Sequence, residues 1–160
     1  MKLHILAVGH RMPAWVQAGF EDYARRMPRE MPVLLTELRP EPRGTGVVSA
    51  ARIERILKLE SERLRAAAPP GCLLVVLDET GQALTTARLA RRLEGWLQQG
   101  RDVCFAIGGA DGLHADLKRS AHLMLSVSAM TLPHQLVRVI LAEQLYRAVS
   151  LLRHHPYHRG

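Results

Sequence analysis

Three short segments of the chain join a preceding apolar run to glycines or small polar residues, a combination that suits ligand binding. They are Asp78-Glu79 after the run 72–77, Gly108-Gly109-Ala110-Asp111-Gly112 after Val103–Ile107, and 128–133 after 123–127. If the runs are parallel strands, all three segments lie at the carboxyl edge of one sheet, where α/β proteins bind ligands. Glycines there let main-chain groups approach a planar or phosphorylated ligand. The sequence predicts such a site, although a purely structural turn explains the glycines equally well.

The C-terminal tail brings together side chains that can contact a nucleotide. Pro156-Tyr157-His158-Arg159 places an aromatic ring, an imidazole and a guanidinium in succession. Such groups stack on bases or hydrogen-bond them, whereas the alternative interpretation is a frayed terminus. The tail histidines are also potential metal ligands, but adjacent histidines point in different directions and no cysteine or carboxylate accompanies them. We therefore expect no metal site.

Several familiar catalytic motifs are missing from the sequence. It contains neither G-x-S-x-G nor H-E-x-x-H, and no Gly-Lys-Ser/Thr of a phosphate-binding loop. A nicotinamide-dependent enzyme would carry G-x-G-x-x-G after its first strand, but Gly9-His10-Arg11-Met12-Pro13 stands there. Cys104 lies in the middle of an apolar run, so packing is a better interpretation than nucleophilic catalysis.

The elements that must position these residues alternate between strand and helix patterns. Apolar runs predict strands at Leu3–Val8, Val33–Leu38, 72–77, Val103–Ile107 and 123–127. Residues 78–81 are expected to turn the chain, and 40–46 to form a loop. Helical spacing predicts helices at about 14–27, 50–67, 86–99, 115–121 and His134–Leu152, the second capped by Ser49 and the third by Thr85 or Thr86. The predicted fold class is α/β, a mostly parallel sheet with helices on both faces, in a single domain over residues 1–160.

The charge balance indicates the kind of partner. Among 160 residues, 22 Lys and Arg stand against 15 Asp and Glu, a net charge of +7 at neutral pH. Polyanions attract such a surface because its cations release counterions from phosphates, while an ordinary solvated basic surface is the alternative. No apolar run approaches the roughly 20 residues of a membrane-spanning helix, and two cysteines in apolar runs fit a reducing compartment. We therefore expect a cytoplasmic protein with no membrane partner.

Several blocks of sequence, in order and at matching spacing over nearly the whole chain, resemble one known family. They are Met1-Lys2-Leu3, Ala7-Val8-Gly9, 108–113, Thr131-Leu132-Pro133-His134, Arg138-Val139, 142–148 and His155-Pro156-Tyr157-His158. The chain resembles the SPOUT superfamily of RNA methyltransferases, in particular its bacterial members that methylate N3 of a pseudouridine in 23S ribosomal RNA. This resemblance implies the cofactor S-adenosylmethionine, a homodimer and a deep trefoil knot near the C-terminus, a feature that general topology rules disfavour.

The resemblance also implies roles for particular residues. The cofactor pocket falls on the same three strand ends, at Leu77, Gly108, Gly109, Val127, Ser128, Ala129, Met130, Thr131 and Leu132. His134, Tyr157 and His158 are candidates for contacting the target base. Arg138 and Arg147 are candidates for contacting the RNA backbone or holding the site. The alternatives are a helix cap for His134 and an ion pair with Glu143 for each arginine.

Two functions remain open from the sequence. The resemblance implies that the assembled ribosome is the substrate, held by the catalytic domain across the dimer, with 40–46 as a candidate contact; no DNA partner is expected. Methyl transfer from a sulfonium requires neither a metal nor a covalent enzyme intermediate, which accounts for the missing motifs. The alternative is a non-enzymatic RNA-binding or ribosome-assembly factor on a SPOUT core. The glycines at 108–109 and the segment 128–133 favour the enzyme, because a pure binder needs no cofactor pocket.

Overall fold

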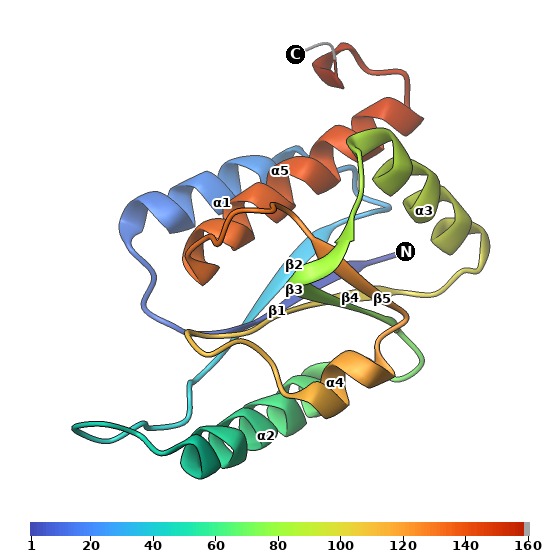
Figure 1. The fold of residues 1–160 in the computed structure, drawn as a ribbon. Helices are drawn as coiled ribbons and strands as arrows, with labels where there is room; N and C mark the ends of the chain where they lie inside the picture. Colours follow the sequence, from blue (N-terminus) through green and yellow to red (C-terminus); the bar gives the residue numbers. More distant parts are fainter. Residues whose placement is uncertain (159–160) are drawn as a thin grey trace.

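The fold is a parallel sheet between two layers of helices (Figure 1). The computed structural model describes residues 1–158, with the side chains of residues 1–157. Its strands are β1 (Leu3–Val8), β2 (Val33–Leu38), β3 (Leu73–Ala83), β4 (Val103–Ile107) and β5 (Leu123–Ser126). Its helices are α1 (Ala14–Arg26), α2 (Ala50–Ala67), α3 (Thr86–Gln98), α4 (Ala115–Ser120) and α5 (His134–Leu152), followed by the short 3-10 turn η1 (Pro156–His158). None of the helices in residues 1–158 has the length and apolar character needed to cross a membrane.

The strands pair in the order β2-β1-β4-β3-β5, and every pair is parallel. This confirms the predicted α/β class. The predicted helix starts are confirmed as well, because the hydroxyl of Ser49 accepts from the amide of Arg52 and that of Thr85 from the amide of Arg88. Such caps satisfy amides that the first helical turn leaves without partners.

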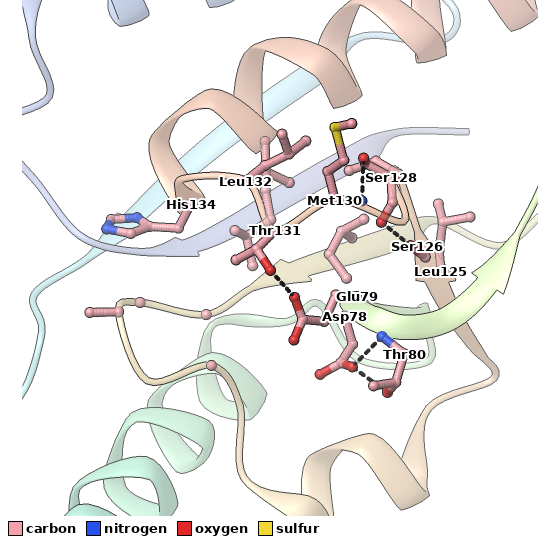
Figure 2. A pocket seen from close by; sticks show the side chains of 18 of the residues that line it. Asp78, Glu79, Thr80, Leu125, Ser126, Ser128, Met130, Thr131, Leu132 and His134 are labelled. Carbon is pink, nitrogen blue, oxygen red and sulfur yellow. Dashed lines mark hydrogen bonds between the residues drawn. The ribbon is translucent and has the colours of Figure 1, made fainter.

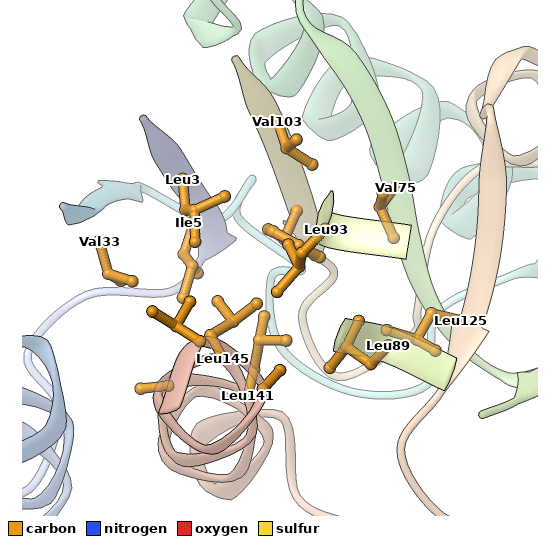
Figure 3. Packing of buried hydrophobic residues seen from close by; sticks show 14 of the residues in the cluster. Leu3, Ile5, Val33, Val75, Leu89, Leu93, Val103, Leu125, Leu141 and Leu145 are labelled. Carbon is orange, nitrogen blue, oxygen red and sulfur yellow. The ribbon is translucent and has the colours of Figure 1, made fainter. Parts of the chain in front are cut away.

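The two faces of the sheet bury different sets of side chains. Leu3, Ile5 and Ala7 of β1 face α1, α3 and α5, where Leu93, Leu141 and Leu145 are fully buried (Figure 3). Leu6 and Val8, on the opposite face, pack with Leu64 of α2 and Leu117 of α4. Because both faces of β1 and β4 are covered, these strands read as continuous apolar runs rather than as alternating patterns.

β3 departs from the prediction that it ends at Leu77. Leu77 and Gln82 both pair with Leu125 of β5, so the residues between them bulge out and the strand then resumes to Ala83. The bulge is held by Asp78, whose carboxylate accepts from the amide of Thr80 at 2.9 Å. At its end, a Cβ on Gly81 would lie 2.8 Å from backbone carbons of β5. The expected turn at 78–81 is therefore wrong: these residues form a bulge within β3, and the strand continues past them.

Substitution of two glycines by alanine is expected to change stability in opposite directions. Gly81→Ala should lower the free energy of unfolding by about 1–3 kcal/mol, because the new methyl group meets rigid backbone. Gly95→Ala, in α3, has open space around the added Cβ and should raise stability by about 0.5–1 kcal/mol through helix propensity. Urea unfolding of both variants measures the difference. Equal effects of the two substitutions would contradict the close contact between β3 and β5.

Candidate active site

A cleft of about 420 Å³ lies at the bulge of β3 and the carboxyl ends of β4 and β5. Three walls enclose it: the bulge of β3, the turn 108–112, and the segment 126–132 that leads into α5 (Figure 2). Its apolar lining comes from Leu77, Ile107, Leu125, Val127, Leu132 and Val137. The three segments that the sequence analysis singled out are therefore brought together. Of the residues expected to bind cofactor, all but Ala129 line the cleft.

The segment 126–132 is held in shape by its own hydroxyl groups. Ser126 donates to the carbonyl of Ser128 at 2.8 Å, and the hydroxyl of Ser128 accepts from the amide of Met130 at 2.9 Å. Across the cleft, the hydroxyl of Thr131 donates to Glu79 on the β3 bulge at 2.8 Å (Figure 2). Because these hydrogen bonds fix the segment 126–132, its remaining main-chain amides and carbonyls are held in one defined arrangement.

The turn after β4 requires glycine for its own conformation. A Cβ on Gly108 would lie 2.5 Å from the carbonyl oxygen of Gly112, and Gly112 has φ +78°. The amide of Gly112 in turn donates to the carbonyl of Gly109 at 3.2 Å. The structural and the ligand-binding interpretations of these glycines are therefore compatible, since the tight turn itself forms one wall of the cleft.

The acidic side of the cleft contains a charge pair that the sequence analysis missed. Asp78 lies 2.6 Å from Lys118 of α4. Burial opposes ionisation of Asp78, but hydrogen bonds from Lys118 and Thr80 outweigh it and lower the pKa of the carboxyl group. The strand end at Asp78 was identified, but no local pattern links it to a lysine forty residues away, which only the parallel sheet brings near.

His134 begins α5 at the end of the cleft opposite Ser126 and Ser128 (Figure 2). Burial, and then the positive charge of Arg138, lower the pKa of its imidazole below the ordinary value of 6.5. His134 is therefore neutral at pH 7. Its Nδ1 atom is buried and has no hydrogen-bond partner among the described residues, and its side chain makes no cap bond for α5.

The comparisons with known proteins agree with this architecture. A family described as "Predicted SPOUT methyltransferase" matches residues 1–158. The chain belongs to this family. Proteins named ribosomal RNA large subunit methyltransferase H from Nitrosomonas eutropha and Burkholderia cenocepacia are 56% and 54% identical to it, over the whole length of both chains. A solved probable methylase family protein from Haemophilus influenzae shares the fold, with a TM-score of 0.57 and 11% identity over 97% of this chain and 69% of its own.

Arg138 lies inside this SPOUT domain, which corrects one of its two expected roles. Its side chain is 1% exposed, so it does not reach an RNA backbone. The guanidinium instead donates to Glu37 of β2 at 2.7 Å and to the carbonyl of Gly9 at 2.8 Å. The expected alternative partner, Glu143, pairs with Arg147 at 2.7 Å. Arg138 thus fastens the ends of β1 and β2 to α5 beside His134.

Tyr157 belongs to η1, which follows the C-terminal end of α5, whereas His134 begins that helix. Its ring stands 4.5 Å from that of Tyr146 and 4.9 Å from the guanidinium of Arg147, and its hydroxyl donates to Glu143 at 3.4 Å. Burial and the neighbouring Tyr23 raise the pKa of Tyr157 to about 12, so the phenol remains protonated. One SPOUT chain therefore does not bring Tyr157 to its own cleft. The side chain of His158 lies outside the described part of the structure.

The neutral state of His134 has a measurable consequence for pH dependence. The unfolded chain takes up a proton at His134 at higher pH than the folded chain, so the free energy of unfolding should fall as the pH drops below 6.5. His134→Gln should remove this contribution. Urea unfolding of both proteins at about pH 7.5 and pH 5.5, with an NMR titration of the ring, measures it. A ring pKa at or above 6.5 would contradict the assignment.

Proposed function

We propose that this SPOUT protein transfers a methyl group from S-adenosylmethionine to N3 of a pseudouridine in large-subunit ribosomal RNA. The carrying observation is the cleft built from 108–112 and 126–132 in a chain that matches, over its full length, relatives named as large-subunit ribosomal RNA methyltransferases. In this proposal the protein works in the cytoplasm on the assembled ribosome. Its excess of basic residues, 22 against 15 acidic ones, suits a ribosomal RNA partner. The trefoil knot implied by the resemblance stays a prediction.

The cleft fits the proposed cofactor in size and in chemistry. Its volume of about 420 Å³ lies within the range of small-molecule sites. Apolar side chains such as Leu77 and Leu132 suit an adenine ring, and the main-chain groups of 126–132 suit its polar edge. The carboxylate of Glu79 suits a cationic donor, whereas that of Asp78 is paired with Lys118. When bound, S-adenosylmethionine supplies an electrophilic methyl group on a sulfonium.

The protein's own contribution is to orient the target nitrogen and to remove its proton. N3 of a uracil-type ring carries a hydrogen that must leave before or during attack on the methyl group, and a neutral imidazole is able to accept it. His134 is the described group at the cleft that fits this role, since burial and Arg138 keep it unprotonated. A His134 ring held in one position beside N3 would also raise the rate of methyl transfer by orienting the target base.

The part of the tail that the structure describes does not line the cleft of its own chain. From Leu152 to His134, α5 covers roughly 27 Å at 1.5 Å per residue, and its sequence contains no glycine or proline at which to bend. The chain from Leu152 to Tyr157 spans at most about 17–18 Å when fully extended. The main chain of a fully extended tail therefore ends roughly 9–10 Å short of the start of α5, and Tyr157 packs against Tyr146 and Arg147 instead of lining the cleft. We propose a homodimer in which Tyr157 and His158 of one copy complete the cleft of the other.

Cofactor binding tests the proposed function directly. Calorimetry should show S-adenosylmethionine binding to the wild type, and Thr131→Trp should abolish it by filling the cleft and breaking the bond to Glu79. Thr36→Trp, at an exposed position of β2, is the matched control and should bind normally. Absence of binding by the wild type at millimolar ligand would favour the non-enzymatic assembly factor.

Mass spectrometry of ribosomal RNA tests the product. A strain lacking the protein should lose one N3-methylated pseudouridine from the large-subunit RNA. The wild-type gene and Thr36→Trp should restore it, and Thr131→Trp should not. An unchanged modification pattern in the deletion strain would overturn the proposed substrate.

Mixed dimers test whether the tail acts on the partner's cleft. Thr131→Trp and His158→Ala should each be inactive as homodimers, while His158→Ala should still bind cofactor. Co-expressed, they form dimers in which one intact cleft meets one intact tail, and these should recover up to about half of the wild-type activity per dimer, one site of two. Single-turnover methylation of ribosomes measures this. Inactive mixed dimers would show that the tail does not serve the partner's cleft.

A further inference from the structure

Arg43 lies in the loop between β2 and α2, far along the chain from every segment of the cleft, yet it contacts one of them. Its guanidinium donates to both carboxylate oxygens of Glu60 on α2, at 2.7 and 3.1 Å. The same group donates to Asp111 in the turn 108–112 at 3.2 Å, and to the carbonyl of Glu41 at 2.7 Å. One planar side chain thus joins a helix, a loop and the wall of the cleft.

Glu60 makes this contact more than a surface ion pair. Its side chain is 2% exposed, and its described partners are Arg43 and the amide of Glu41, the latter at 2.9 Å. A buried carboxylate requires such compensation, and removing one partner of a buried pair is strongly destabilising. The position of Arg43 is therefore fixed by the interior of the protein, and Asp111 is fastened to a rigid anchor.

Other bonds from α2 hold the chain immediately after the turn. The amide of His114 donates to Ser61 at 3.3 Å, and the ring of His114 lies 2.7 Å from Glu54. Arg65 donates to the carbonyl of Asp116 at 2.9 Å. α2 thus fastens His114 and Asp116 directly, but Glu60 and Asp111 carry like charges and would repel each other. Because the positively charged Arg43 lies between them and donates to both carboxylates, it links Asp111 to Glu60.

We propose that Arg43 is a positioning residue for the methyl-donor cleft, because its bridge between Glu60 and Asp111 sets the turn 108–112 against α2. The proposal rests on the proposed function in one respect, namely that the cleft binds S-adenosylmethionine. Arg43 itself does not line the cleft. Its effect on the cofactor passes through Asp111 and the glycines beside it.

Single substitutions distinguish the buried pair of Arg43 and Glu60, which affects stability, from the contact with the turn 108–112, which affects cofactor binding. Asp111→Asn keeps the buried pair of Arg43 and Glu60, so the melting temperature should stay near that of the wild type while the affinity for S-adenosylmethionine falls about tenfold, the size of one charge-assisted hydrogen bond. Arg43→Lys keeps the charge but lacks the planar fork, so it should partly preserve stability and lose affinity in the same way. Arg63→Gln is the matched control, because Arg63 pairs with Glu41 in the same loop and does not touch the turn. It should bind normally.

A double-mutant cycle decides whether Arg43 acts through Asp111. Glu60→Gln removes the buried charge but keeps a side-chain oxygen that accepts from Arg43, so the bridge to Asp111 persists in this background. There, Arg43→Gln and Asp111→Asn should each weaken binding, and the combination should bind no more weakly than either alone. Additive losses would overturn the proposal, because they would mean that the two residues act separately on the cofactor. Normal affinity of Arg43→Gln in this background would overturn it as well.

Amide hydrogen exchange without ligand keeps the proposal independent of the proposed function. The amides of 109–113 should exchange about tenfold faster in Arg43→Gln/Glu60→Gln than in the Glu60→Gln parent, because the equilibrium constant for local opening of the turn rises about tenfold. Arg63→Gln should leave the exchange rates of these amides unchanged. Unchanged exchange would overturn the positioning role. If the wild type binds no S-adenosylmethionine but the turn loosens as expected, the proposed function fails while the bridge stands.

Discussion

The turn after β4 folds back so closely that a Cβ on Gly108 would lie 2.5 Å from the carbonyl oxygen of Gly112. β4 lies between β1 and β3 in the sheet, so this turn stands next to the bulge of β3 and lines the cleft together with it. The tight fold-back leaves the cleft open over β3 and β5. It also brings Asp111 to Arg43 and places Leu113 in the core between the sheet, α2 and α4. The cleft therefore depends on a backbone contact that only glycine allows.

Each wall of the cleft is fastened by polar contacts. Asp78 on the β3 bulge is tied to Lys118, Asp111 to Arg43, and Thr131 to Glu79 on the bulge. Such contacts restrict motion more than they contribute free energy, since partly exposed ion pairs are weak. A reaction that requires orientation of a donor and an acceptor benefits from this arrangement. The absence of nucleophile motifs from the sequence fits a site whose residues position groups and exchange a proton.

Local patterns predicted most of the fold, because most elements end at residues with a clear backbone preference. The bounds of β1, β2, β4 and α5 agree with the sequence analysis, since glycines and prolines flank them. β3 was the exception: Asp78–Thr80 has turn chemistry, but pairing with β5 on both sides of the bulge carries the strand onward. A periodicity argument cannot weigh a hydrogen-bonded partner that lies some forty residues away.

Three of the contacts that hold the site could not be predicted from the sequence, because each joins residues that lie far apart along the chain. Arg138 with Glu37, Lys118 with Asp78, and Arg43 with Glu60 each join residues from different elements. Arginine and lysine are usually exposed, so the interior place of Arg138 contradicts the ordinary expectation. What the sequence did indicate were the strand ends themselves, because residues at the carboxyl edge of a parallel sheet converge whatever holds them.

The rigid length of α5 links the site to the charge of the whole protein. His134 begins a helix that no glycine or proline interrupts, and Tyr157 packs against the C-terminal half of that helix rather than at the cleft, so the proposed site takes these two residues from two different chains. Because each chain has a net charge of +7 at neutral pH, two chains together carry +14. Because phosphate attraction grows with the number of cations that meet the backbone, the pairing that completes the proposed cleft also doubles the charge available to the RNA. The separation of Tyr157 from His134 within one chain therefore accounts both for the proposed two-chain site and for the higher positive charge beside it.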